Sequence, residues 1–323
     1  MLRFLTQASL AVAGAACLWG YVFSRKAATG DKNKKKYWDL SAGLFFLFAG
    51  SFSFFVVGWW FMALFVYPTL IYGHEGVVHT TQDFIRAGFQ AGLPIVVLAT
   101  ITGFAGILAF IKKAEYFKGI AHKFFAVQFI LLSVILALSS YTGTVGRLQL
   151  SYILHNWHSI ITLGTVVVVD FLFLYTLHKD SLKRVLYPAY PVMSAFIWIG
   201  LGMDFISSGL FNNFDPIHNT QFVFNQIVIA IIIMNGALLS VYLNDAFTSL
   251  IKKTKVNKPS EALEEIVRIS GSVSIVSWVT ITFLDFTRVY LDLNYLFAIY
   301  MGLIALAYLL KPAAEKSASK LFA

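Results

Sequence analysis

Long apolar stretches alternate with short polar segments along almost the whole chain of 323 residues. A helix rises about 1.5 Å per residue and therefore needs about 20 apolar residues to cross about 30 Å of hydrocarbon. The second stretch exceeds this length, so we expect it to tilt or to extend along the interface beyond Pro68. The pattern predicts nine membrane-spanning helices, at residues 5–24, 40–72, 91–111, 124–144, 157–177, 189–211, 222–244, 269–290 and 294–310.

The composition agrees with a protein whose solvent is lipid. Hydrophobic residues make up 58% of the chain and charged residues only 13%, a balance that does not suit a soluble domain. The predicted fold class is therefore an all-α polytopic transmembrane bundle. The domain prediction is an N-terminal anchor or signal-like helix at 1–24, a basic cytoplasmic loop at 25–39, a helical bundle at 40–311 and a cytoplasmic tail at 312–323.

The positive charge follows the predicted spans. All but four of the 25 lysines and arginines fall in alternate loops, and the exceptions are Arg3, Arg86, Arg147 and Arg288. Basic residues concentrate in cytoplasmic loops, so the pattern predicts an outside N-terminus and a cytoplasmic C-terminus in a bacterial inner membrane. This bias explains the net charge of +9 without nucleic acid as a partner.

The first apolar stretch fits either a retained anchor or a cleaved signal peptide. Arg3 precedes it, as in a signal peptide, but Ala16 and Cys17 offer no clean small-residue cleavage site. A basic cluster at 25–36 follows, as a stop-transfer signal would, so we favour a retained helix. Its removal would leave eight spans with the same sidedness.

The longest loop, residues 245–268, contains a further helical signal. Glu261, Glu264 and Glu265 have the spacing of one helical face and follow Ser260, a residue type that caps helices. The spacing predicts a short surface helix in a solvated connector.

The second half of the chain contains a weak repeat. Ser194 and Trp198 precede Asp204-Phe205 in the sixth span, while Ser274 and Trp278 precede Asp285-Phe286 in the eighth. Asp170 and Asn235 match in the preceding spans. We expect spans five plus six and seven plus eight to be two copies of one helical hairpin, a duplication that is common in transporters.

Five of the seven histidines fall on the predicted outer side. The pair His155 and His158 is spaced to share one helical face, and neutral imidazoles so placed can bind one metal. Copper and zinc are the expected ions, and haem b fits less well because long same-helix histidine spacing is missing. The alternative is that these histidines bind headgroups and water. The candidate metal ligands are His74, His79, His155, His158 and His218.

Three acidic residues fall within predicted spans, where a carboxylate is costly unless it is neutral, paired or facing water. Asp170 lies deep in the fifth span and could serve a proton path or form an interhelical hydrogen bond. Asp204 and Asp285 occupy matched positions near the outer face, where Arg147 or Arg288 could pair with them.

A family resemblance rests on the segment Gly58 to Pro68, followed by Arg86 and by Thr102-Gly103. With Asn235-Gly236 in a later span, this arrangement resembles bacterial membrane proteins of the copper-resistance D type and their uncharacterised relatives. The likeness covers about a third of the chain. It implies handling of copper across the inner membrane, with ligands on the outer side.

Three functional hypotheses follow from these residues. The first is a membrane protein that handles a metal ion or another small solute at its outer face, with an outer-face metal carrier as a partner. The second is a non-catalytic subunit of a larger membrane complex, in contact with other membrane subunits. The third is a proton-coupled transporter that uses Asp170. An enzyme is less favoured, since no catalytic grouping stands out.

Overall fold

The computed structural model is an all-α polytopic helical bundle, as the hydropathy pattern predicts. Among the described residues only short turns interrupt the helices, and none of these residues forms a strand. The described residues are 2–29, 32–61, 79–139, 150, 154, 157–158, 160–176, 180–211, 220–251, 261–286 and 291–322.

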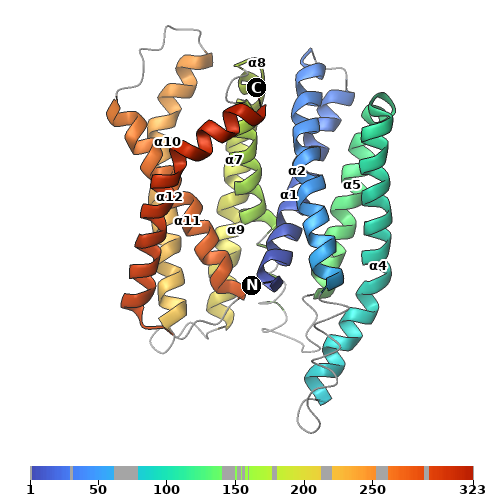
Figure 1. Ribbon diagram of the computed structural model, residues 1–323, viewed down its shortest axis with the longest axis horizontal. Coiled ribbons are helices and arrows are strands. Elements are labelled where there is room, and N and C mark those ends of the chain that lie inside the picture. The colour runs from blue at the N-terminus through green and yellow to red at the C-terminus, as the bar shows by residue number, and fades with distance from the viewer. Residues whose placement is uncertain are drawn as a thin grey trace. The chain divides into compact units, whose positions relative to one another are not determined.

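The chain divides into two compact units, Met1–Phe211 and Asn212–Ala323, each held together by its own contacts (Figure 1). Unit 1 begins with two long hairpins, which are followed by a broken helix and a final span. Its elements are α1 (Leu2–Ala28), α2 (Lys34–Phe61), α4 (His79–Lys112), α5 (Ala114–Ser139), the π-helical turn η2 (Ile160–Gly164), α7 (Thr165–Thr176), α8 (Asp180–Leu186), the 3-10 turn η3 (Tyr187–Ala189) and α9 (Tyr190–Phe211). Unit 2 consists of α10 (Thr220–Ile251), α11 (Glu261–Phe286) and α12 (Leu293–Phe322).

Each predicted span overlaps a described helix, although residues 62–72, 140–144 and 287–290 of these spans lie outside the described residues. The length and polarity of its helices make the chain an integral membrane protein. Seven described helices are long and apolar enough to cross a membrane, and two shorter apolar helices lie at Ile160–Leu172 and Arg268–Leu284. The 34 residues of α4 would measure about 51 Å, more than a bilayer core requires. This helix therefore starts well before the predicted boundary at residue 91.

One prediction needs correction. Glu261, Glu264 and Glu265 are helical, but they form the first turns of the continuous helix α11 and not a separate surface helix. The polar residues 261–268 contain no glycine or proline that would separate them from the apolar span. The helix α12 runs through Pro312 to Phe322, so most residues of the predicted tail are helical. Ser260, the predicted cap, lies outside the described residues.

The helix α1 lies at the centre of unit 1. It packs against α2, α5, η2 and α7, and side chains from Leu10 to Phe23 are buried all around it. Small residues allow this close packing: a Cβ on Gly164 of η2 would collide with the Ala11 carbonyl oxygen. Removing α1 would therefore expose the centre of unit 1, and its retention in the mature protein stays a prediction.

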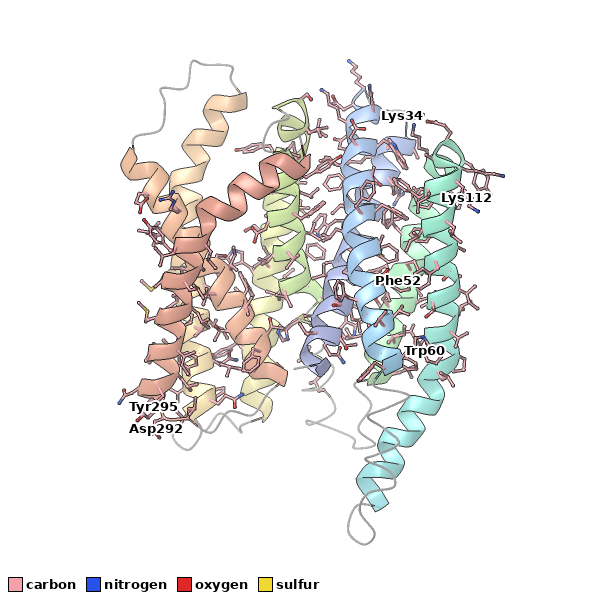
Figure 2. All side chains as sticks on the ribbon, viewed as in Figure 1. Lys34, Phe52, Trp60, Lys112, Asp292 and Tyr295 are labelled. Atoms are coloured by element: carbon pink, nitrogen blue, oxygen red, sulfur yellow. The ribbon has the colours of Figure 1, made fainter. Side chains whose placement is uncertain are left out.

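A cluster of phenylalanine rings joins α2 to the hairpin of α4 and α5. The ring of Phe45 stacks on Phe110 at 4.4 Å between centroids and lies 4.8 Å from Phe117. Glycines on α4 accept the rings, since a Cβ on Gly103 would overlap the ring of Phe52, which Figure 2 labels. The contacts fix α2 between α1 and the second hairpin.

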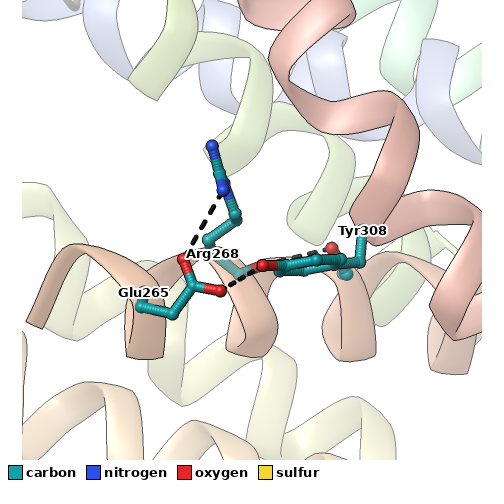
Figure 3. Close-up of polar contacts among 4 residues, drawn as sticks. Glu265, Arg268 and Tyr308 are labelled. Atoms are coloured by element: carbon teal, nitrogen blue, oxygen red, sulfur yellow. Dashed lines mark hydrogen bonds and ion pairs between the residues drawn. The ribbon is translucent and has the colours of Figure 1, made fainter. Parts of the chain in front are cut away.

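In unit 2, polar contacts link the helices at several levels. The Ser277 and Tyr300 hydroxyls share a hydrogen bond of 2.6 Å between α11 and α12. Near the start of α11, Tyr308 donates a hydrogen bond to Glu265, which pairs with Arg268 at 3.5 Å (Figure 3). These contacts fix α12 along α11.

Candidate functional site

A buried histidine–aspartate pair is the candidate site. The Nε2 atom of His158 lies 3.7 Å from Oδ1 of Asp204, and the two side chains are only 6% and 1% exposed. His158 lies two residues before the start of the π-helical turn η2, and Asp204 lies on α9. Both residues were predicted as separate candidates, but their pairing was not.

The sequence of α9 turns Asp204 toward the protein. Met193, Gly200, Asp204 and Ser207 recur at helical spacing and are buried, whereas Phe205 and Ile206 are 52% and 47% exposed. Phe205 and Ile206 thus face away from unit 1, while the Asp204 carboxylate faces the other helices of this unit. The Ser207 hydroxyl donates a 2.9 Å hydrogen bond to the Asp204 backbone carbonyl.

The close approach of η2 and α9 sets the pairing. A Cβ on Gly200 would overlap the Thr162 hydroxyl, so the two backbones are in near contact at this level. Thr162 lies one turn after His158, and Gly200 lies one turn before Asp204. Because the segments run antiparallel, contact at Thr162 and Gly200 brings His158 opposite Asp204. Gly200 is the sequence feature that allows this contact, and Gly202 offers the same feature two residues later.

Further polar groups continue inward from the pair. Thr162 and Thr165 are fully buried, and the indole Nε1 of Trp19 on α1 donates to the Thr165 hydroxyl at 3.3 Å. The Thr162 hydroxyl has no hydrogen-bond partner among the residues that the structure describes. The Trp19 ring packs edge-on against Phe196 of α9 at 5.5 Å. A polar seam therefore runs along η2 between α1 and α9.

The electrostatics of the pair depend on its proton count. A protonated histidine beside a carboxylate forms a neutral pair, whose mutual attraction offsets part of the cost of removing two charges from water. Loss of one proton leaves an uncompensated buried carboxylate, which is far more costly. The arrangement therefore favours a state with at least one proton on the pair. Among the described residues, His158 faces Asp204 and is charged only when protonated, whereas Arg147 and Arg288 lie outside them.

The other predicted site residues are not brought to this pair by the described structure. Asp170 is exposed on α7, and its carboxylate interacts electrostatically with Tyr190 of α9. His79 opens α4 and Asp285 lies in α11, with neither side chain described. His74, His155 and His218 fall outside the described residues. Among the residues that are described, no three or more His, Cys, Asp or Glu side chains group as a metal site.

The contacts extend the predicted repeat. Asp170 interacts with Tyr190 in unit 1, and Asn235 donates from Nδ2 to the Ser270 carbonyl at 2.9 Å in unit 2. Tyr190 and Ser270 each lie four residues before the matched serines, Ser194 and Ser274. The residues matched by the repeat thus lie near each other in both hairpins, as the predicted duplication requires.

The matched acid of the second hairpin is Asp285, which follows Leu284 on α11. The Leu284 backbone carbonyl accepts a 2.6 Å hydrogen bond from Gln221 of α10.

Comparison of the chain with family models, with curated proteins and with solved structures gave no match. The resemblance to the copper-resistance D type therefore stays a prediction. The fold defines the class as an integral membrane helical bundle, and the function must be argued from the site.

Proposed function

We propose that this protein is a proton-coupled membrane transporter of a small solute and that His158 and Asp204 form its proton-binding site. The observation that carries the proposal is the 3.7 Å separation of two titratable atoms that are almost fully buried among apolar helices. Intramembrane titratable pairs of this kind mark ion and proton pathways, because their burial is costly without a functional return.

Burial of the histidine–aspartate pair links proton binding to a change of conformation. In a closed conformation the pair keeps its proton, because an unpaired carboxylate would be buried. In a conformation that admits water, the same carboxylate can lose the proton at little cost. Proton binding thus shifts the balance between closed and open states, as any ligand does that binds one state more tightly. A solute that favours the open state is then coupled to the proton.

The backbone beside the pair suits such a change. The turn η2 is π-helical, and π-helical turns within α-helices occur frequently at functional sites. Its contacts with α1 and α9 pass through Gly164 and Gly200. Small residues at an interface allow helices to lie close and to shift without large side-chain rearrangements.

The test is solute uptake into vesicles that contain the purified full-length protein. An imposed pH gradient should drive uptake of at least one solute from a panel of radiolabelled amino acids, sugars, carboxylates and metal ions. Asp204→Asn should abolish the dependence on the gradient, whereas Asp292→Asn, which changes an exposed acid between α11 and α12, should keep it. Gradient-driven uptake that survives Asp204→Asn would contradict the proposal.

A metal ion is the second candidate for the same site, and the distance favours it. Two ligand atoms about 2.1 Å from a tetrahedral metal ion lie about 3.4 Å apart, close to the observed separation of Nε2 and Oδ1. Elemental analysis of the purified protein would decide: stoichiometric copper or zinc that is lost in His158→Gln supports a metal site. A protein without metal, or metal unaffected by this substitution, counts against it.

A further inference from the structure

Two hairpin ends in unit 1 combine into one positively charged surface. It is defined here by Arg25, Lys26, Lys34, Lys36, Lys112 and Lys118, and is called the basic surface. The first four residues lie where α1 passes into α2, and the last two lie where α4 passes into α5. Figure 2 shows Lys34, at the start of α2, and Lys112, at the end of α4, on the same side of unit 1. Five of the six residues are exposed, and Lys36 is half-buried.

An aromatic contact joins the two hairpin ends. The Trp38 indole of α2 lies 6.4 Å from the Phe117 ring of α5, and the Lys118 ammonium lies 5.7 Å from the Trp38 ring centroid. Lys26 lies over the Tyr37 ring at 5.4 Å in the same way. Charges from α1 and α5 thus converge on neighbouring aromatic residues of α2.

Few described acids balance these charges. Glu115 forms an ion pair with Lys118, and Asp39 is half-buried on α2. Arg25, Lys26, Lys34 and Lys112 have no salt bridge to any acid that the structure describes. The basic surface therefore has an excess of positive charge for an anionic partner.

The position of the surface indicates the kind of partner. It lies at the ends of membrane-spanning helices, where tryptophan and tyrosine sit at the headgroup level. Exposed apolar side chains adjoin the charges: Ile111 is 71% exposed beside Lys112, and Tyr116 is 63% exposed beside Phe117. A ligand that offers an anionic group next to hydrocarbon matches both features. A soluble anion would match only the charges.

We propose that the basic surface binds the headgroups of anionic phospholipids, with their acyl chains along the apolar residues below. Lysines and arginines directly at the ends of membrane helices attract such lipids, with about 1 kcal/mol for each charge near the surface. Trp38 lies within the surface and serves as its spectroscopic reporter. The proposal is independent of the histidine–aspartate pair and of any transport activity.

The test is quenching of tryptophan fluorescence by brominated lipids in vesicles that contain the full-length protein. The difference between this protein and a Trp38→Phe variant isolates the signal of Trp38. Brominated phosphatidylglycerol should quench that signal at a lower lipid fraction than brominated phosphatidylcholine. Each of Lys34→Gln and Lys118→Gln should weaken the preference about fivefold, the change that corresponds to about 1 kcal/mol.

Controls separate a lipid site from the alternatives. The single variant Lys316→Gln loses the same charge elsewhere in the chain and should keep the preference. Labelling of Thr29→Cys with an impermeant maleimide checks that each variant keeps its orientation and fold, since Cys17 is buried. Equal quenching by both lipids, or an unchanged preference in both lysine variants, would overturn the proposal. Loss of the preference on adding inorganic phosphate at constant ionic strength would instead assign the surface to a soluble anion and overturn it too.

Discussion

Gly200 of α9 lies so close to Thr162 of η2 that a methyl group at residue 200 would overlap the threonine hydroxyl. This contact brings His158 opposite Asp204, one turn away on each segment. The proton-binding proposal thus depends on a backbone approach that only a residue without a side chain permits. The contact between Gly200 and Thr162 also predicts how a substitution of Gly200 affects stability.

Substitution of Gly200 should separate η2 from α9. We expect Gly200→Ala to destabilise the protein by about 1–3 kcal/mol, the usual cost of inserting a methyl group into a closely packed interface. The midpoint of thermal unfolding in mild detergent measures this loss. Gly202→Ala is the matched control, because nothing lies within 4 Å of its Cβ position. Equal unfolding temperatures for the two variants would show that η2 and α9 are not in close contact.

The two partners of the pair should be energetically coupled. Removing one charge from a buried pair costs about 3–5 kcal/mol, because the other is left uncompensated. We therefore expect Asp204→Asn and His158→Gln each to destabilise the protein strongly, and the double variant to lose less than their sum. Unfolding measurements on all three variants provide the double-mutant cycle. Additive losses would mean that the two side chains do not interact.

The hydrogen bond between Trp19 and Thr165 should stabilise α1 against α7. We expect Trp19→Phe to lower the free energy of unfolding by more than the roughly 0.5–1.5 kcal/mol of one hydrogen bond, since the smaller ring also leaves a gap. Trp198→Phe is the control, because Trp198 is 46% exposed while Trp19 is 2% exposed. A loss for Trp198→Phe equal to that for Trp19→Phe would contradict the packing of α1 described above.

Retention of α1 can be tested through the only cysteine. Cys17 is fully buried in α1, so a maleimide should not label the native protein but should label it after denaturation in detergent. Labelling on denaturation shows that α1 is present in the mature chain. Protein from its native membrane that stays unlabelled even when denatured would show that the helix had been removed.

Hydropathy and charge predicted the helices because a bilayer demands long apolar segments from any chain that crosses it. The ends of α10 and α11 were less predictable, since no glycine or proline marks where the apolar span joins a polar extension of the same helix, and α12 continues through Pro312. The division into two units depends on side-chain packing and has no local sequence signal.

The site was predictable only in part. Asp204 was conspicuous as an acid in an apolar segment, and His158 as one of a closely spaced pair of histidines. Their contact depends on the antiparallel register of η2 and α9, which Gly200 and Thr162 set. Gly200 and Gly202 lie two residues apart in the same apolar span, but nothing lies within 4 Å of the Cβ position of Gly202. The sequence alone therefore could not show which glycine makes the contact.

Infrared titration tests the central claim most directly, because it observes the Asp204 carboxyl group and how it responds to the proton of the pair. The purified protein should show a carboxylate stretching band that shifts in frequency as the pair gains or loses its proton, disappears in Asp204→Asn and loses this shift in His158→Gln. The same band should persist in Asp292→Asn. A band that is unchanged by Asp204→Asn, or the absence of any titrating band in the unmodified protein, would contradict the claim that His158 and Asp204 bind and release a proton.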